Sequence, residues 1–274
     1  MAFICFNGQY HDEQQPILKA ANKSYRYGDG FFETIKVWKG RIVLAAYHEK
    51  RILNSLEVLQ YKLPPLATVE KIFSQLIELC KKNKCLDAAR VRLSFSNGDG
   101  GLFDENRELQ YIIESWPLPA AIHELNENGL VTGIFPWARK SCDRWANLKS
   151  ASALMYSAAA TYAKQHQWND SFITNQYGRI CETTIANLFW IKNHTIFTPP
   201  LTEGCVSGVM RAYLIDSIKT VSEKPCQASD LIEADEVFLT NAIRGIKWVK
   251  SMEAATYQNK SAAQLVQQYI LPLH

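Results

Sequence analysis

The chain has 274 residues, and 30 lysines and arginines stand against 27 aspartates and glutamates, so its formal net charge is only +3. A chain of this length can bury a sizeable core in one or two domains without disulfides. Its composition, 47% hydrophobic and 21% charged, is typical of globular proteins and excludes a disordered chain or a coiled coil. The small excess of positive charge argues against nucleic acid as a partner.

The seven cysteines are scattered and contain no CxxC pair, so we expect reduced thiols. The sequence has no zinc-ligand spacing and no HExxH motif, and we expect no metal. The first residues lack the basic and apolar segments of a secretory signal, and no stretch is apolar over a membrane-spanning length. These features predict a cytoplasmic protein with no membrane partner.

In the first part of the chain, short β-type runs end at turn signals such as Asn7-Gly8 and Gly28-Asp29-Gly30. Two longer segments place apolar residues at helical spacing. We expect strands at Phe3–Phe6, Phe31–Trp38, Arg41–Ala45, Ala89–Phe95 and Leu109–Ser115, and helices at Tyr47–Leu59 and Val69–Lys82. This pattern predicts an α+β domain.

The segment Trp116-Pro117-Leu118-Pro119 marks the predicted boundary between two domains, 1–116 and 117–274, because its two prolines stop both helix and sheet. Many short strands and few helices predict a larger, barrel-like second domain, which carries Lys149. Its expected strands are Leu130–Phe135, Asp170–Thr174, Asn187–Lys192, Thr195–Phe197 and Glu236–Thr240, and its expected helices are Ala151–Gln165 and Ser207–Val221.

Two ionisable residues could carry chemistry. Lys149 stands at the edge of an apolar run of small residues, where desolvation would lower its pKa and make it a usable amine nucleophile. Glu182 stands among apolar neighbours and could pair with a protonated ring nitrogen. The alternatives are a solvated lysine that begins a helix and an acid that caps a turn.

Two further features suit a phosphate. Ser207-Gly208 leads into a predicted helix, whose first backbone N–H groups could bind an anion. Arg51 could supply a bidentate charge to the same group. Each also has an ordinary interpretation, as a common helix start and as an exposed helix arginine.

Six ordered segments together resemble the class IV aminotransferases, a family of pyridoxal 5′-phosphate (PLP) enzymes that includes branched-chain and D-amino acid aminotransferases and aminodeoxychorismate lyases. The similarity runs from Phe6-Asn7-Gly8 to about Val249. The segments are Tyr27–Thr34, His48–Arg51, Leu148–Ser150, Glu182–Phe189, Gly204–Arg211 and Thr240–Ala242.

The resemblance implies a two-domain α+β fold of fold type IV, with PLP between a small domain and a larger pseudo-barrel domain, usually in a homodimer. It implies that Lys149 forms the Schiff base with PLP and shuttles protons, and that Glu182 pairs with the pyridine nitrogen. It assigns the 5′-phosphate to Arg51, the backbone amides of Val209 and Met210, and the turn formed by Asn241 and Ala242.

Within the family, the pocket residues resemble the lyases most. The Tyr27–Gly30 turn is similar to the lyase and D-amino acid branches, and Leu154 stands where branched-chain enzymes have a tyrosine. Phe32 replaces the tyrosine with which D-amino acid enzymes trap the substrate carboxylate. Thr34 matches a threonine close to the reacting carbon of the lyases, whereas Glu33 resembles the aminotransferases.

We therefore expect a lyase that converts 4-amino-4-deoxychorismate to 4-aminobenzoate and pyruvate in folate biosynthesis, with Lys149 and Thr34 as catalytic residues. Phe32, Arg92 and Arg244 are expected to face the substrate, and the sequence leaves open whether Arg90, Arg92 or Arg244 binds its carboxylate. The alternative is a PLP-dependent aminotransferase that acts on a small D- or branched-chain amino acid. A non-catalytic protein is disfavoured, because it would need neither Lys149 nor Glu182.

Overall fold

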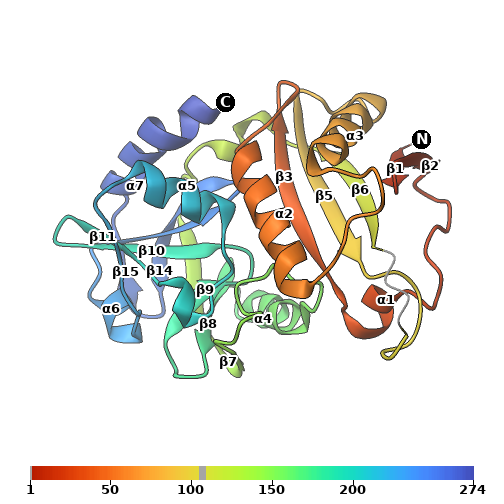
Figure 1. The fold of residues 1–274 in the computed structure, drawn as a ribbon. Coiled ribbons are helices and arrows are strands. Elements are labelled where there is room, and N and C mark those ends of the chain that lie inside the picture. Colours follow the sequence, from red (N-terminus) through yellow and green to blue (C-terminus); the bar gives the residue numbers. More distant parts are fainter. Residues whose placement is uncertain (1, 105–108) are drawn as a thin grey trace. The chain divides into compact units, whose positions relative to one another are not determined.

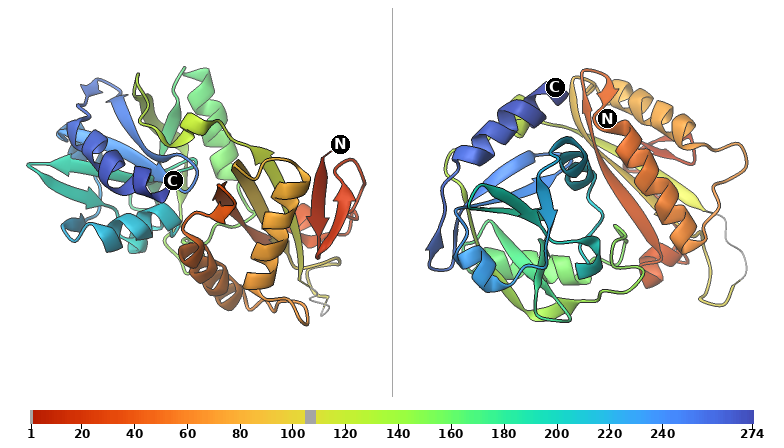
Figure 2. Two further views of the ribbon diagram at one scale, coloured as in Figure 1. Left: turned by 90° about the horizontal axis from the view of Figure 1, so that it is seen from above. Right: turned by 60° about the vertical axis from the view of Figure 1, so that its left-hand side comes forward.

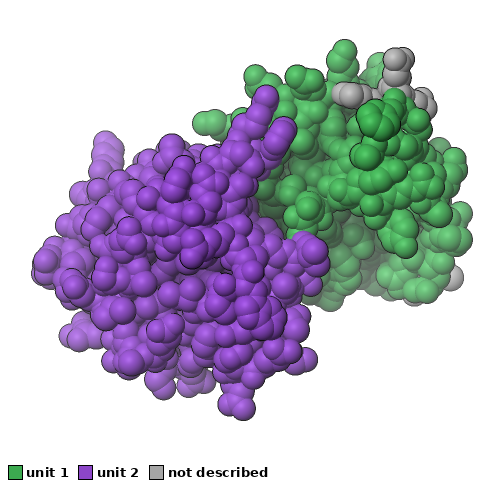
Figure 3. All heavy atoms as spheres, turned by 90° about the horizontal axis from the view of Figure 1, so that it is seen from below, with its two compact units in different colours: residues 1–122, 148–153, 274 green, residues 123–147, 154–273 purple. Residues whose placement is uncertain are grey.

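The computed structural model describes residues 2–104 and 109–274 and contains two compact units (Figure 1). The first unit comprises the described residues up to 122 together with 148–153 and 274, and the second comprises 123–147 and 154–273 (Figure 3). Each unit has its own sheet and its own hydrophobic core.

The first unit contains a six-stranded antiparallel sheet in the order β2-β1-β6-β5-β3-β4. Its strands are β1 (Phe3–Phe6), β2 (Gln9–Asp12), β3 (Gly30–Trp38), β4 (Arg41–Ile42), β5 (Ala88–Ser96) and β6 (Gln110–Pro117). Its helices are α1 (Lys23–Tyr27), α2 (Ala45–Leu59) and α3 (Val69–Lys82).

Side chains alternate between the two faces of this sheet, as the period of a strand requires. Phe31, Ile35 and Val37 of β3 are buried on one face, where α2 and α3 contribute apolar residues to the same core. Figure 2 shows these two helices side by side over the sheet. Phe32 and Thr34 therefore lie on the second face, away from this core.

A short return of the chain completes the first unit. Leu148–Ala153 runs antiparallel to the start of β3: Phe32 N donates to Lys149 O at 2.9 Å, and Ala151 N donates to Gly30 O at 2.8 Å. These hydrogen bonds keep residues 151–153 out of the helix expected at Ala151–Gln165, which begins only at Leu154. Lys149 consequently belongs to the first compact unit, not to the unit predicted to carry it.

The second unit contains a closed barrel, because β10, β13, β14, β7, β8 and β9 pair in turn and β9 pairs again with β10. The predicted α+β fold with a pseudo-barrel is thus confirmed. The strands are β7 (Leu130–Lys140), β8 (Asp170–Asn175), β9 (Ile180–Thr183), β10 (Asn187–Lys192), β11 (Thr195–Thr198), β12 (Val221–Glu223), β13 (Glu236–Asn241), β14 (Gly245–Met252) and β15 (Ala255–Thr256).

The helices of the second unit are short and follow its strands. They are α4 (Leu154–Gln165), η2 (Leu201–Glu203), α5 (Val209–Ser217), α6 (Ala228–Ile232), α7 (Lys260–Leu265), η3 (Val266–Ile270) and η4 (Leu271–Leu273), and the short helix η1 (Ala120–His123) precedes them. The expected helix at Ser207–Val221 is shortened at both ends, because Gly208 and Ile218 have extended backbones.

Two of the expected strands also differ from the structure. The strand expected at Arg41–Ala45 ends at Ile42, because Leu44 takes a left-handed conformation (φ 57°) and α2 begins at Ala45. The strand expected at Leu109–Ser115 continues through Pro117, the first proline of the predicted domain boundary. The division at residues 116 and 117 stays a prediction.

Over the described ranges, no helix is long and apolar enough to cross a membrane. The same residues contain no group of three or more His, Cys, Asp or Glu side chains arranged to hold a metal ion.

One glycine of the barrel supports a direct test of its packing. A Cβ built on Gly133 in β7 would lie 2.2 Å from the ring of Trp168, far inside van der Waals contact. We expect Gly133→Ala to lower the free energy of unfolding by about 1–3 kcal/mol, the usual cost of overpacking. Urea denaturation measures this value. Gly101→Ala, whose Cβ would lie an ordinary 3.6 Å from Asp104, is the control and should leave stability nearly unchanged.

Candidate active site

Lys149 faces the aromatic ring of Phe32 in the first unit. Its Nζ lies 4.5 Å from the ring centroid, and the Arg92 guanidinium lies 3.8 Å from the same centroid. The pairing of Leu148–Ala153 with β3 sets Lys149 opposite Phe32, so both side chains stand on the second face of the sheet. Two cations thus meet at one apolar ring, an arrangement stabilised by the negative face of the aromatic system.

Thr34 lies on the same face, in a row that crosses three strands. Thr34 of β3 is the cross-strand partner of Arg92 of β5, which is the partner of Glu114 of β6. Burial raises the pKa of Glu114, although Arg92 and Arg90 act in the opposite direction. Burial also lowers the pKa of Arg92 from its ordinary value, against the opposing charge of Glu114. This face therefore brings together Lys149, Phe32, Thr34 and Arg92.

Arg51 lies on α2 and pairs with Glu33, whose side chain leaves β3 on the helix-covered face. Its Nε and Nη2 donate to the two oxygens of Glu33 at 2.7 and 2.6 Å, so part of its guanidinium is already engaged by a carboxylate. His48 Nδ1 lies 2.6 Å from Glu33 Oε2 and donates to it, since a carboxylate can only accept. Burial alone would raise the pKa of Glu33, but Arg51 and His48 outweigh it and hold that pKa at about 2.

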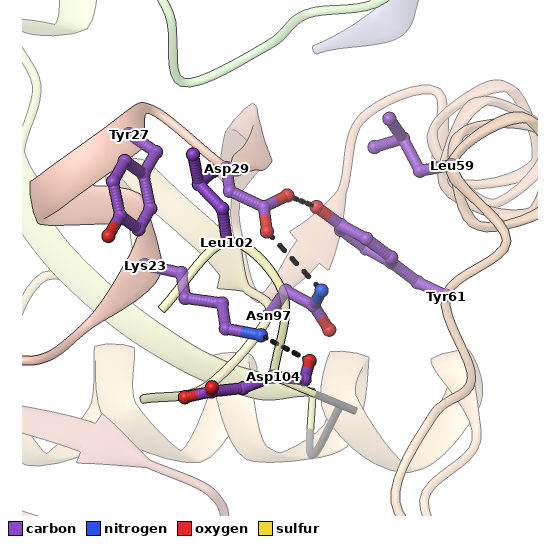
Figure 4. A pocket seen from close by; sticks show the side chains of 8 residues that line it. All are labelled: Lys23, Tyr27, Asp29, Leu59, Tyr61, Asn97, Leu102 and Asp104. Carbon is purple, nitrogen blue, oxygen red and sulfur yellow. Dashed lines mark hydrogen bonds between the residues drawn. The ribbon is translucent and has the colours of Figure 1, made fainter. Parts of the chain in front are cut away.

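The turn before β3 lines a polar pocket of about 200 Å³, which Figure 4 shows from close by. Asp29 accepts hydrogen bonds from the Tyr61 hydroxyl and from Asn97 Nδ2, the latter at 3.3 Å. Lys23 Nζ donates to the backbone oxygen of Asp104 at 3.3 Å. These side chains hydrogen-bond to neighbouring groups of the same pocket. The bonds to Asp29 fix the Tyr27–Gly30 turn, from which β3 starts.

In the second unit, Glu182 lies on β9 and is buried. Its Oε1 accepts from Lys140 Nζ at 2.5 Å and from the Tyr156 hydroxyl at 2.6 Å. Its Oε2 accepts from the backbone N–H of Val206 at 2.8 Å. The carboxylate is thus held rigidly by β7, by α4 and by the loop that leads into α5.

The same loop presents the amino terminus of α5. Asn147 Nδ2 donates to Leu201 O and Cys205 O, and Asn187 Nδ2 donates to Val206 O at 2.9 Å. No side chain caps the helix at Gly208. A Cβ on Gly208 would lie 1.8 Å from Asn187 Oδ1, so only glycine fits this approach to the helix. The backbone N–H groups of Val209 and Met210 open the helix and have no partner within it.

The predicted turn at Asn241 and Ala242 follows β13. Asn241 Oδ1 accepts from the backbone N–H groups of Ile243 and Arg244 at 3.1 and 2.8 Å, which fixes the turn. Arg244 itself is exposed. Asn241 Nδ2 donates to the backbone oxygen of Ile185 at 3.3 Å, so both ends of the carboxamide hold the chain around the turn.

These groups fit PLP when each unit is considered by itself. The first unit offers an amine, Lys149 Nζ, beside an aromatic ring. The second offers a buried carboxylate, Glu182, which suits a protonated ring nitrogen. It also offers an uncapped helix terminus, with Gly208 as the residue that leaves room, and such a terminus suits a phosphate.

Sequence reasoning missed Lys140 and Tyr156, the two side chains that hold Glu182. It also left open what His48 does beyond packing near Arg51. The sequence did contain a signal for the Glu33 ion pair. Glu33 alternates with apolar residues that face the core, and a buried acid needs a basic partner. Lys140 offered no such signal, since its partner is 42 residues away in the chain.

Comparisons with known proteins agree with this arrangement. The family model described as amino-transferase class IV matches residues 30–252. The aminodeoxychorismate lyase of Bacillus subtilis (strain 168) is 31% identical, over 94% of this chain and 89% of that protein. The branched-chain-amino-acid aminotransferase of Escherichia coli (strain K12) is 25% identical, over 92% and 85%. The crystal structure of a branched-chain aminotransferase from Thermoproteus uzoniensis superposes with a TM-score of 0.88 at 20% identity, over 99% of this chain and 94% of that one.

The Glu33 network supports a prediction about stability. At neutral pH, Glu33→Gln leaves Arg51 without its buried counter-ion, so we expect the free energy of unfolding to fall by about 3–5 kcal/mol. A carboxyl whose pKa is lower in the folded chain stabilises the fold above its unfolded value and loses that contribution as the pH falls. The difference between variant and wild type should therefore shrink between about pH 4.5 and about pH 2. Urea denaturation over this range checks it, and a constant difference would contradict the assignment.

Proposed function

The chain belongs to the class IV aminotransferase family, and from this membership we propose that it is an aminodeoxychorismate lyase, which converts 4-amino-4-deoxychorismate to 4-aminobenzoate and pyruvate in folate biosynthesis. Enzymes of this family depend on PLP, so PLP is its cofactor. The relative named aminodeoxychorismate lyase, at 31% identity over 94% of the chain, supports this choice.

One observation carries the proposal: Thr34 shares a sheet face with Lys149 and Phe32. Thr34 and Phe32 are two residues apart on β3, so their Cα atoms are about 7 Å apart and both side chains leave the strand on one side. Lys149 Nζ lies against the Phe32 ring. A hydroxyl on the same face as the amine can serve a second proton transfer, which an elimination requires.

The reaction needs two proton transfers and one bond cleavage, and we assign both transfers to this face. Bound PLP supplies an electron sink for the charge that develops when a proton leaves the carbon bearing the substrate amine. Lys149 Nζ removes that proton, and the carbon–oxygen bond to the enolpyruvyl group then breaks. Thr34 relays a proton to the methylene carbon of the departing group, which leaves as pyruvate. Atoms balance without an oxidant or a reductant.

The following residues are the cofactor contacts that we propose. Lys149 attaches it, Glu182 carries the negative charge that suits its ring nitrogen, and the N–H groups of Val209 and Met210 suit its phosphate. Arg51 and the backbone of the turn at Asn241 and Ala242 are the further phosphate contacts that we propose.

For the substrate carboxylate we propose Arg92. It is half-buried and lies over Phe32 on the face that carries Lys149 and Thr34. Arg90 shares that face, but it is exposed and stacks on Trp116 at 4.6 Å. Arg244, which lies in the other unit, is exposed as well. A guanidinium partly shielded from water binds a carboxylate more strongly than an exposed one.

The second candidate is an aminotransferase, favoured by the 25% identical branched-chain relative. Glu33, the residue that resembles the aminotransferases, lies on the helix-covered face with His48 and Arg51. The Glu33 side chain therefore faces away from Phe32 and Thr34, where we propose that substrate binds. Its likeness to the aminotransferases is no argument for an aminotransferase substrate. The homodimer and the cytoplasmic location stay predictions.

A single comparative assay tests the function. The purified PLP-bound protein is mixed with aminodeoxychorismate, generated in place by a synthase, and 4-aminobenzoate and pyruvate are measured. A parallel panel of L- and D-amino acids is scored for formation of pyridoxamine 5′-phosphate. We expect 4-aminobenzoate without amino-acid turnover. Formation of pyridoxamine 5′-phosphate without 4-aminobenzoate would make the protein an aminotransferase.

The role of Thr34 has its own test. We expect Thr34→Val to lower the rate of 4-aminobenzoate formation by about 10²–10⁴-fold, the usual contribution of a general acid–base group. The amount of PLP fixed to Lys149 by borohydride, measured by peptide mass spectrometry, should not change. Thr34→Ser, which restores a hydroxyl, should recover most of the rate. A Thr34→Val rate within about threefold of wild type would refute the relay.

A further inference from the structure

Glu182 has a charged partner that the proposed mechanism does not use. Lys140 Nζ lies 2.5 Å from Glu182 Oε1, and both side chains are at least nine-tenths buried. The other two donors to this carboxylate, the Tyr156 hydroxyl and the Val206 N–H, carry no charge. Lys140 is the last residue of β7 and Glu182 lies on β9, so the sheet itself brings the pair together.

Burial penalises an isolated carboxylate, which takes up a proton unless a cation compensates it. A protonated Glu182 would lack the negative charge that attracts a protonated ring nitrogen, and would be only a weak hydrogen-bond acceptor for it. Before PLP arrives, the ring nitrogen is absent and cannot act as the counter-ion. The ammonium of Lys140 can.

We propose that Lys140 is a positioning residue that keeps Glu182 ionised and oriented in the cofactor-free protein, so that the carboxylate is ready for the protonated ring nitrogen of PLP. This inference rests on the proposed role of Glu182. Its second consequence is orientation: with Lys140 and Tyr156 on Oε1, one lone pair of Oε2 remains beside the bond from Val206.

Other ionisable groups around the pair do not change charge near pH 7. Hydrogen bonds from Ser141 and from the backbone of Trp145 lower the pKa of Asp143, near Lys140, so this carboxyl is already ionised. Burial raises the pKa of the thiols of Cys142 and Cys181, the pKa of Cys205 to about 12, and the pKa of the Tyr156 hydroxyl. The nearby cations Arg179 and Arg211 are paired with other carboxylates, Glu203 and Glu223. A titration that appears near neutrality when Lys140 is replaced can therefore be assigned to Glu182.

The test measures PLP binding to the apoprotein and not activity. In Lys140→Met, Glu182 should be protonated at about pH 6 and ionise as the pH rises toward about 9, the range of buried glutamates without a cation. We expect the dissociation constant of PLP for this variant, divided by that of wild type at the same pH, to fall at least about 10-fold over this range. The ratio cancels the titrations of PLP itself. Lys140→Arg, which keeps the charge, should give a flat ratio.

Two controls separate charge from packing. Tyr156→Phe removes a neutral donor from the same oxygen of Glu182. Its dissociation constant for PLP, divided by that of wild type, should therefore be raised by a factor that does not vary with pH. Lys140→Met combined with Glu182→Gln removes both charges and should also give a flat ratio. Should Lys140→Met not fold, Lys140→Gln, which drops the charge and keeps a donor, replaces it. A flat ratio for the uncharged single variant would overturn the inference.

An analogue of PLP with carbon in place of the ring nitrogen distinguishes this failure from a failure of the proposed site. If wild type binds PLP and the analogue equally well, Glu182 does not meet the ring nitrogen, and the proposed site is wrong. If wild type prefers PLP but the ratio for Lys140→Met is flat, the site stands and the role of Lys140 is wrong. We expect wild type to prefer PLP, and the analogue to give a flat ratio with every variant.

Discussion

The chemistry assigned to Lys149 depends on two backbone hydrogen bonds between Leu148–Ala153 and the start of β3. Their register sets Lys149 opposite Phe32. A slip of one residue would reverse the face on which every side chain of the segment stands. Lys149 would then point toward the face of Glu33, whose carboxylate already binds two basic residues. The register thus decides whether the amine lies on the face with Thr34 and Arg92 or on the face with the ion pair of Glu33 and Arg51.

Two buried carboxylates, Glu33 in the first unit and Glu182 in the second, have basic partners that differ in kind. The planar guanidinium of Arg51 donates to both oxygens of Glu33, and His48 donates a third hydrogen bond. Lys140 is a point charge on a single oxygen of Glu182. Both carboxylates accept three hydrogen bonds, so the difference lies in the partner: a planar guanidinium fixes the plane of the carboxylate, whereas an ammonium acts as a compact charge on one oxygen. The first arrangement suits a structural anchor between β3 and α2, and the second suits a carboxylate that still has to receive a cofactor.

Local pattern was enough to predict most elements, because the alternation in β3 and the helical spacing in α3 are strong signals. It also led to Lys149 and Glu182, since both stand in recognisable segments. It could not lead to Lys140, because its approach to Glu182 depends on the pairing of β7, β8 and β9. That pairing contains register shifts, one of them between Ile134 and Arg139, which no sequence period reveals. The return of Leu148–Ala153 to the first unit is likewise a tertiary contact.

The alternation of β3 also bears on how residues are weighed when relatives are compared. Glu33 and Thr34 are neighbours in the chain, yet they leave the strand on opposite faces. Glu33 belongs with α2 and its charges, and Thr34 belongs with Lys149 and Arg92. A likeness to aminotransferases at position 33 therefore concerns the contact between the sheet and α2, and not the substrate. A likeness to lyases at position 34 reports on the face where substrate is proposed to bind, so the second carries more weight for the reaction.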